Sequence, residues 1–221
     1  LGNQESLNSV WGLWNNATLK TAIFLFPIAT SLFTFAPEFM STLFSPKYEA
    51  SAPIFRIYLL LVFLRITQYG SLLQAMGKTR LIFTTSAVSL LLNLILSIVF
   101  IPLFGITGPA WANVVTVYVW ALIYLVMLCR LTKVSFSAIM PWRSLGKLLF
   151  LALIAGILAN LVHLLTLSYF PLLVVGLLIY GVVYLLLLIL THTLEVSTVI
   201  HLVYQLRDQV REMLQPLVLK I

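Results

Sequence analysis

One cationic side chain stands inside an otherwise apolar run of the sequence, where a charge needs a partner. Arg65 lies within the run 53–75, and a helix there would place Tyr58, Gln68 and Tyr69 on the same face as Arg65, at roughly 100° per residue. A guanidinium is always charged and offers a forked set of donors that suits phosphate or carboxylate. The pattern favours an anion-binding site in a water-filled cavity. Alternatively, Arg65 reaches along its stem toward the cytoplasm, or it belongs to a structural hydrogen-bond network.

A carboxylate and a second arginine lie nearer the opposite membrane surface. Glu38 falls in the run 19–44, and Arg56 lies one turn into the next run. An isolated acidic group at membrane depth could bind a coupling proton or a sodium ion. Because the two residues would lie at comparable depth on neighbouring antiparallel helices, we favour an ion pair between Glu38 and Arg56.

Two further runs carry polar residues at helical spacing. They are Ser86, Ser89, Asn93 and Ser97 in one run, and Asn113, Thr116, Trp120 and Tyr124 in the next. Such residues could line an aqueous cavity, where hydroxyls and amides bind sugars and aromatic rings stack on them. They could equally hold helices together through hydrogen bonds. Both interpretations stay open.

No combination of residues predicts catalysis. The sequence has no paired carboxylates at helical spacing in its apolar runs and no His/Cys cluster, so we expect neither a metal site nor a cofactor. Met76-Gly-Lys-Thr79 resembles the end of a phosphate-binding loop but lacks the upstream glycine, and it is predicted to be a turn. The single cysteine, Cys129, excludes internal disulfides. The protein is therefore not expected to be an enzyme.

The amino-acid composition predicts that this chain is embedded in a membrane. Hydrophobic residues make up 62% and charged residues 9% of the sequence, and the mean hydropathy is +1.09. Residues 81–101 carry no charge and would span about 30 Å as a helix, the thickness of a bilayer core. We predict an all-α integral membrane protein with six transmembrane helices, at about residues 19–44, 53–75, 81–101, 109–129, 146–167 and 172–190.

The net charge of +7 follows the predicted topology and does not indicate nucleic-acid binding. With the N-terminus inside, ten of the basic residues fall on the cytoplasmic side, as the positive-inside rule requires. These are Lys20, Lys78, Arg80, Arg130, Lys133, Arg143, Lys147, Arg207, Arg211 and Lys220. Lys47 falls outside, and Arg56 and Arg65 fall within a helix. Both termini are predicted to be cytoplasmic.

Four segments differ in character along the chain. Residues 1–18 form a cytoplasmic or interfacial segment, 19–130 hold four crossings, 131–190 hold a basic loop and two more crossings, and 191–221 form a tail. In the fifth crossing Ala152, Ala155, Gly156, Ala159 and His163 share a face suited to close helix packing. The tail carries one apolar stripe and is predicted to be an amphipathic helix on the inner membrane surface. Pairing with a partner helix is the alternative.

Several short motifs resemble a known family. They are Leu43-Phe-Ser-Pro-Lys-Tyr-Glu-Ala50, Ile54-Phe-Arg-Ile57, Leu73-Gln-Ala-Met-Gly-Lys78 and Ile101-Pro-Leu-Phe-Gly-Ile-Thr-Gly-Pro-Ala110. They are similar to the second half of bacterial polysaccharide exporters, the O-antigen (Wzx-like) and exopolysaccharide flippases of the MATE-like multidrug/oligosaccharidyl-lipid/polysaccharide superfamily. The resemblance covers about residues 19–130. Ser45-Pro46 replaces a glycine usual after Leu-Phe, and Pro109 replaces a usual alanine.

The resemblance implies two lobes of helices around a central cavity, of which this chain looks like helices nine to fourteen. Because the chain opens at Leu1 without Met, we expect a missing upstream portion. The implied activity is the transfer of polyprenyl-diphosphate-linked oligosaccharide from the inner to the outer leaflet of the bacterial inner membrane by alternating access. The implied partners are membrane lipid, that oligosaccharide and other polysaccharide assembly proteins. The candidate cavity residues are Arg65, Gln68, Tyr58, Asn93, Asn113 and Tyr124.

Two other functions remain as alternatives. A small-molecule or drug cation antiporter of the same superfamily should hold more carboxylates in its cavity, and here only Glu38 qualifies. A membrane-embedded polysaccharide polymerase or glycosyltransferase usually needs a large external loop, whereas the external turns predicted here are short.

Overall fold

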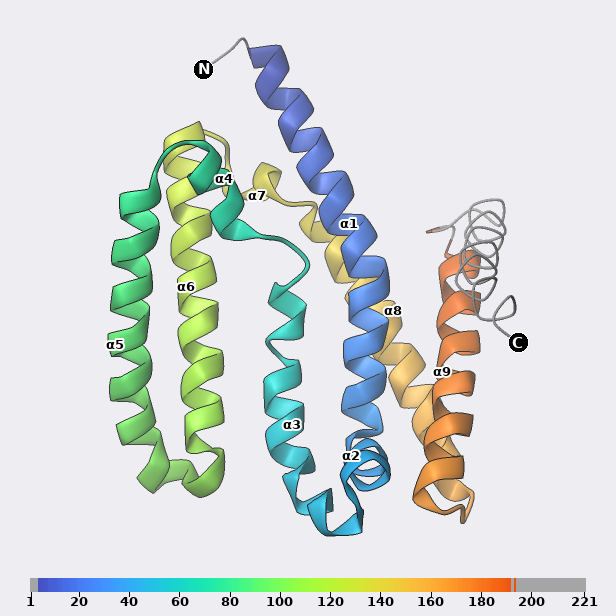
Figure 1. Ribbon diagram of the computed structural model, residues 1–221. Helices are drawn as coiled ribbons and strands as arrows, with labels where there is room; N and C mark the ends of the chain where they lie inside the picture. Colours follow the sequence, from blue (N-terminus) through green and yellow to red (C-terminus); the bar gives the residue numbers. More distant parts are fainter. Residues whose placement is uncertain (1–3, 192, 194–221) are drawn as a thin grey trace, which may run out of the picture.

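Within residues 4–191 and residue 193, which the computed structural model describes, every regular element is a helix. Five segments are long and apolar enough to cross a membrane: Val10–Thr34, Pro46–Ala75, Thr79–Thr132, Trp142–Leu164 and Tyr169–Leu190. The third segment turns back on itself into two antiparallel helices, α5 (Thr79–Phe104) and α6 (Gly108–Thr132) (Figure 1). The prediction of an all-α, multi-pass membrane protein is confirmed. The predicted tail helix from Leu194 onward lies outside the described residues.

Proline fixes the course of the first crossing. Helix α1 (Gln4–Thr34) begins well before the predicted start at residue 19. The chain bends at Phe35 and continues into α2 (Ala36–Phe44). Pro37 lies in the first turn of α2 and has no N–H, so the carbonyl of Phe33 loses its helical donor. A short 3₁₀ helix, η1 (Pro46–Ser51), follows Ser45, whose φ of 113° lies in a region that glycine favours.

The second crossing is broken, and the prediction of one helix over 53–75 is wrong. The chain forms α3 (Ala52–Leu59), a 3₁₀ turn η2 (Val62–Leu64), a non-helical link and then α4 (Tyr69–Ala75). The N–H of Leu64 bonds to the Leu61 carbonyl, one residue short of the helical partner. The Leu60 carbonyl accepts a hydrogen bond from the Tyr118 hydroxyl of α6 at 2.9 Å. A tertiary donor thus replaces the helical one and stabilises the break.

The helices form two regions that α3 connects (Figure 1). In the first, α8 (Trp142–Ala159), the short η4 (Asn160–Leu164) and α9 (Tyr169–Leu190) pack against α1 and α2; we call this the bundle. Four small residues of α8 are buried in it: Ala152, Ala155, Gly156 and Ala159. A Cβ at Gly156 would lie 3.0 Å from Thr34 Oγ1, so the predicted packing face is in contact with α1.

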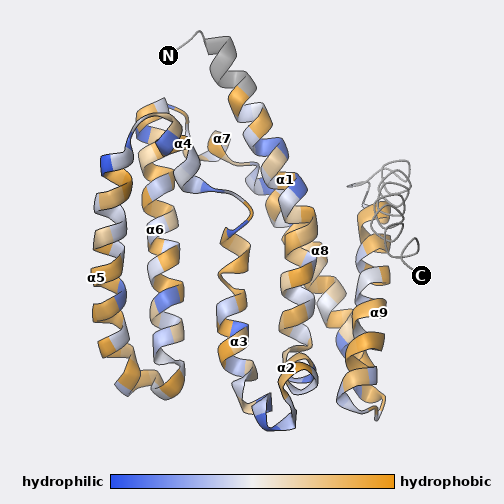
Figure 2. Ribbon diagram, viewed as in Figure 1, coloured by the Kyte–Doolittle hydropathy of each residue, from blue (hydrophilic) through white to orange (hydrophobic). Residues whose placement is uncertain are grey.

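The second region consists of α4, α5 and α6, with the short α7 (Phe136–Ile139) after them. Gly77 and Gly105 lie just before α5 and just after it. Their φ values of 69° and 57° are ones that residues other than glycine rarely adopt. No residue of α5 is buried. Hydrophilic residues gather around α4, whereas α9 is almost entirely hydrophobic (Figure 2).

Candidate functional site

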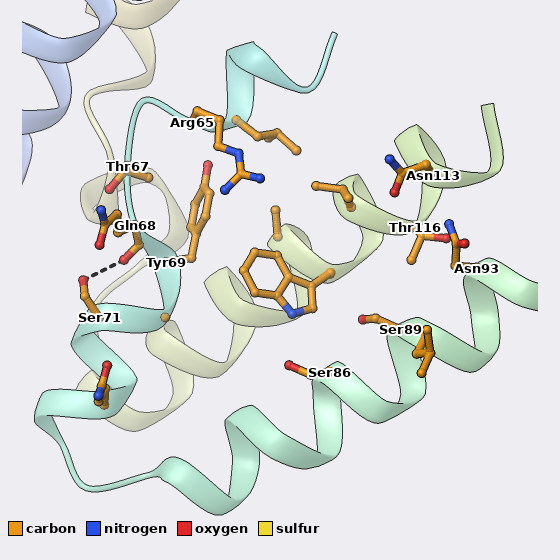
Figure 3. A pocket seen from close by; sticks show the side chains of 17 residues that line it. Arg65, Thr67, Gln68, Tyr69, Ser71, Ser86, Ser89, Asn93, Asn113 and Thr116 are labelled. Atoms are coloured by element: carbon orange, nitrogen blue, oxygen red, sulfur yellow. Dashed lines mark hydrogen bonds between the residues drawn. The ribbon is translucent and has the colours of Figure 1, made fainter. Parts of the chain in front are cut away.

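A partly open cavity of about 780 Å³ lies between the broken second crossing and the α5–α6 pair (Figure 3). Four stretches of chain contribute to it: the link after η2, α4, α5 and α6. Its polar lining residues are Arg65, Thr67, Gln68, Tyr69, Ser71, Gln74, Ser86, Ser89, Asn93, Asn113, Thr116 and Trp120. Apolar residues complete it at Leu64, Gly70, Leu90, Val117 and Ala121.

The break in the second crossing brings neighbouring residues to the same cavity. In a continuous helix Arg65 and Thr67 would point about 200° apart around the axis. The non-helical link allows both of them, and Gln68, to line the cavity. The Ser71 hydroxyl donates to the Gln68 carbonyl at 2.7 Å and closes the first turn of α4 (Figure 3).

The facing wall comes from α5 and α6, where polar residues recur at helical spacing. Ser86, Ser89 and Asn93 project from α5, and Asn113 and Thr116 from α6 (Figure 3). The Thr116 hydroxyl is occupied, because it donates to the Ala112 carbonyl of its own helix at 2.8 Å. In contrast, the amides of Asn93 and Asn113 have no hydrogen-bond partner among the described residues. Those amides are free to bind a ligand.

Arg65 is the one charged residue in this lining, which contains no carboxylate. Its side chain extends into the space that the labelled residues surround (Figure 3). The guanidinium forms no ion pair with the described residues. The cavity therefore carries an uncompensated positive charge next to neutral hydrogen-bonding groups, an arrangement that suits an anion attached to a polar molecule.

The structure places four of the six predicted cavity residues, Arg65, Gln68, Asn93 and Asn113, in this one cavity. Tyr58 is exposed on α3 outside it, because the break ends the helical face on which Tyr58 and Arg65 would be neighbours. Tyr124 is fully buried: its ring packs on Trp120 at 4.2 Å between centroids, and its hydroxyl accepts from Thr85 Oγ1 at 3.1 Å.

Sequence reasoning missed three lining residues, Thr67, Ser71 and Gln74. Each was hidden by the assumption of a continuous helix, in which they fall off the face of Arg65. The signal was present in Thr67-Gln-Tyr-Gly-Ser71, a polar and glycine-containing interruption of an apolar run. Interrupted membrane helices commonly mark binding sites, because their freed backbone groups need a cavity or a partner.

The predicted pair of Glu38 and Arg56 is not what the structure shows. Arg56 Nε donates to the Phe33 carbonyl at 2.9 Å, and its guanidinium lies 5.6 Å from the Phe33 ring centroid. Pro37 leaves this carbonyl without a helical donor. Arg56 therefore donates to the Phe33 carbonyl and does not pair with Glu38. Glu38 instead contacts His163 of η4, with 3.0 Å between Oε1 and Nε2.

Comparison with known proteins identifies a solved structure with a similar fold. No family model and no curated protein matches the chain. Among solved structures, the chain is similar to the lipid II flippase MurJ in an inward closed conformation, with a TM-score of 0.63 and 24% sequence identity over 79% of this chain. The chain spans 37% of the length of that protein. The described helices thus have the fold of one part of an all-helical membrane flippase.

Proposed function

We propose that this chain is part of a flippase that moves polyprenyl-diphosphate-linked oligosaccharide from the inner to the outer leaflet by alternating access, for surface polysaccharide biosynthesis. The observation that carries the proposal is the uncompensated charge of Arg65 in a polar cavity within a membrane-spanning segment. The likeness of the fold to a flippase of lipid II supports the same class of transport.

The chemistry of the cavity matches the head group of such a lipid. A diphosphate is an anion that the forked donors of Arg65 can bind with two parallel hydrogen bonds. Asn93 and Asn113 offer amides to sugar hydroxyls, and Trp120 offers an aromatic face on which a sugar ring can stack. A volume of about 780 Å³ is within the range of sites that bind small molecules.

The orientation and cellular location belong to the same proposal. The start of α1, the α4–α5 turn, the connection from α6 to α8 and the end of α9 lie at one end of the molecule (Figure 1). Six of the ten basic residues in the described part of the chain lie in or beside these connections: Lys78, Arg80, Arg130, Lys133, Arg143 and Lys147. This distribution favours a cytoplasmic location for that end and for both termini. The proposed setting is the bacterial inner membrane, with residues 19–130 as part of a transport lobe and 131–190 as two added helices.

The alternatives fit the cavity less well. A drug cation needs carboxylates, and the lining contains none. A polymerase or glycosyltransferase needs room for sugar chemistry outside the lipid, and the connections between the described helices are short.

The experiment replaces Arg65 in the full-length protein within cells and measures surface polysaccharide together with the amount of protein in the membrane. Since hydrogen bonds to charged groups contribute about 1.5–3 kcal/mol, Arg65→Ala is expected to lower export about tenfold or more, and Arg65→Lys less. Arg80→Ala is the matched control, because Arg80 is exposed and lies outside the cavity. Normal export by Arg65→Ala at an unchanged membrane level contradicts the proposal.

A further inference from the structure

Three enclosed oxygen atoms of α2 have no hydrogen-bond partner among the described residues. They are Glu38 Oε2, Ser41 Oγ and Thr42 Oγ1. Glu38 and Ser41 are only 6% and 4% exposed, and all three residues lie in the bundle, outside the cavity. Because buried polar groups in folded proteins nearly always have a partner, three such oxygens on one short helix favour a ligand that binds to them.

The spacing of these residues places them on one face of α2. Positions 41 and 42 are three and four residues after position 38 in the helix, so the Cβ atoms of Ser41 and Thr42 lie about 5–6 Å from that of Glu38. At this spacing the terminal oxygens of the three side chains can reach a common point. A carboxylate oxygen with two hydroxyl oxygens is a set of ligands that suits a hard cation.

The charge of Glu38 gives this set its preference for a cation. Its other oxygen, Oε1, lies 3.0 Å from His163 Nε2. A neutral imidazole with its proton on Nε2 donates to the ionised carboxylate but brings no positive charge. Among the described residues no lysine or arginine forms an ion pair with Glu38, and Arg56 donates to the Phe33 carbonyl instead. A buried carboxylate without a countercharge is costly, and a cation at Oε2 removes that cost.

Charge balance selects a monovalent ion. One carboxylate neutralises one positive charge, whereas a divalent ion would leave a surplus charge buried in the bundle. Divalent metals also take several carboxylate, imidazole or thiolate ligands. The part of the chain that the structure describes contains no group of three such side chains. The ligand class that fits is therefore an alkali cation, sodium or potassium.

We propose that Glu38, Ser41 and Thr42 form a binding site for one alkali cation. Glu38 Oε2 and the two hydroxyl oxygens contact the ion, and His163 orients the carboxylate by donating to Oε1. The site lies just after the bend at Phe35 that separates α1 from α2, and interrupted membrane helices are where transporters commonly bind such ions. Because none of the three residues lines the cavity, binding of the ion does not require the transported lipid.

The test measures equilibrium binding of radioactive sodium to the full-length protein in detergent, without substrate and at constant ionic strength. The wild-type protein is expected to bind one more ion than Glu38→Gln, whose amide keeps the size of the side chain and removes its charge. Ser41→Ala and Thr42→Val should each weaken binding about tenfold or more, the effect typical of changes around a bound metal ion. Unlabelled sodium or potassium should displace the label, whereas choline should not.

Two matched controls remove a hydroxyl and a carboxylate elsewhere. Ser31→Ala deletes a buried hydroxyl that already donates to the Ile28 carbonyl, and Glu49→Gln neutralises an exposed carboxylate that accepts from Tyr169. Both should bind sodium as the wild type does, and thermal unfolding in sodium-free buffer checks that every variant is folded.

Three results would overturn the proposal. The first is equal binding by the wild type and Glu38→Gln, and the second is displacement of the label by choline. The third is an unchanged affinity in both Ser41→Ala and Thr42→Val, which would mean that these hydroxyls bind buried water only. If Glu38→Gln does not fold, the two hydroxyl variants decide the question. Since no substrate is present, the outcome is separate from that of the proposed function.

Discussion

The bundle and the cavity treat polar groups at membrane depth in opposite ways. In the bundle, each carbonyl that a proline of α1 or α2 deprives of its helical donor has a side-chain donor: Tyr184 donates to Ile23, four residues before Pro27, and Arg56 donates to Phe33. In the cavity, Arg65 and the two asparagine amides have no such partner among the described residues. Paired polar groups maintain the fold, whereas unpaired groups facing an open space are available to a ligand.

The largest loss of stability is expected from a substitution that disturbs the packing of the bundle. A Cβ at Gly176 of α9 would overlap the fully buried ring of Phe35. Gly176→Ala should therefore lower the free energy of unfolding by about 1–3 kcal/mol, the usual cost of overpacking. Thermal unfolding in detergent provides the measurement. Gly181→Ala on the same helix is the control, since nothing lies within 4 Å of its added Cβ. Equal melting temperatures for the two variants would contradict this packing.

A smaller effect is expected where a charged donor is removed. Arg56→Ala leaves the Phe33 carbonyl without its donor and should cost about 1 kcal/mol of stability. Pro37→Ala restores an N–H that can reach this carbonyl, so Arg56→Ala should cost less in that background. A double-mutant cycle of unfolding free energies measures the difference. Additive effects would mean that the arginine does not compensate for the proline.

Removal of a neutral donor, the Tyr184 hydroxyl, should cost less stability than removal of the charged Arg56. Tyr184→Phe removes the donor to the Ile23 carbonyl and keeps the ring. We expect the free energy of unfolding to fall by about 0.6 kcal/mol, the average for side-chain hydrogen bonds in a membrane protein. Pro27→Ala should reduce this loss, because it supplies the missing helical N–H. A loss that is the same with and without Pro27 would refute the pairing.

The smallest change in stability is expected in the cavity. Arg65→Ala removes no partner from the described residues, so the free energy of unfolding should change by less than about 0.5 kcal/mol, even though transport is expected to fall. Unfolding in detergent, performed beside Arg56→Ala, sharpens the contrast between a structural arginine and a ligand-binding one. A loss as large as that of Arg56→Ala would place Arg65 among the structural residues.

The sequence predicted the membrane class, the helical architecture and most of the polar wall of α5 and α6, because these follow from local composition and helical spacing. Asn93 and Asn113 were found in this way. The start of the break, at residues 60–64, could not be predicted from its own residues, which are apolar and contain no proline. It depends on the Tyr118 hydroxyl reaching the Leu60 carbonyl, a contact between distant segments.

Contacts between residues that are far apart in the sequence could not be predicted either. Glu38 and Arg56 are close in sequence and at similar predicted depth, whereas His163 reaches Glu38 only because η4 packs beside α2. Tyr124 follows the spacing of Asn113 and Thr116, yet α4 lies over it, with a Cβ at Gly70 only 3.5 Å from its ring. Helical periodicity identifies a face, and only the tertiary fold decides whether that face is covered.

The most direct test of a wet, cationic cavity compares two cysteines on opposite faces of α5. Ser89 lines the cavity, whereas Leu91 is 60% exposed on the outer surface. In membranes, Ser89→Cys should react with charged methanethiosulfonates, faster with the anionic sulfonate than with the cationic trimethylammonium reagent, and Arg65→Gln should abolish that preference. Leu91→Cys, facing lipid, should react with neither. An unreactive Ser89→Cys, or a preference that persists without the Arg65 charge, would contradict the account.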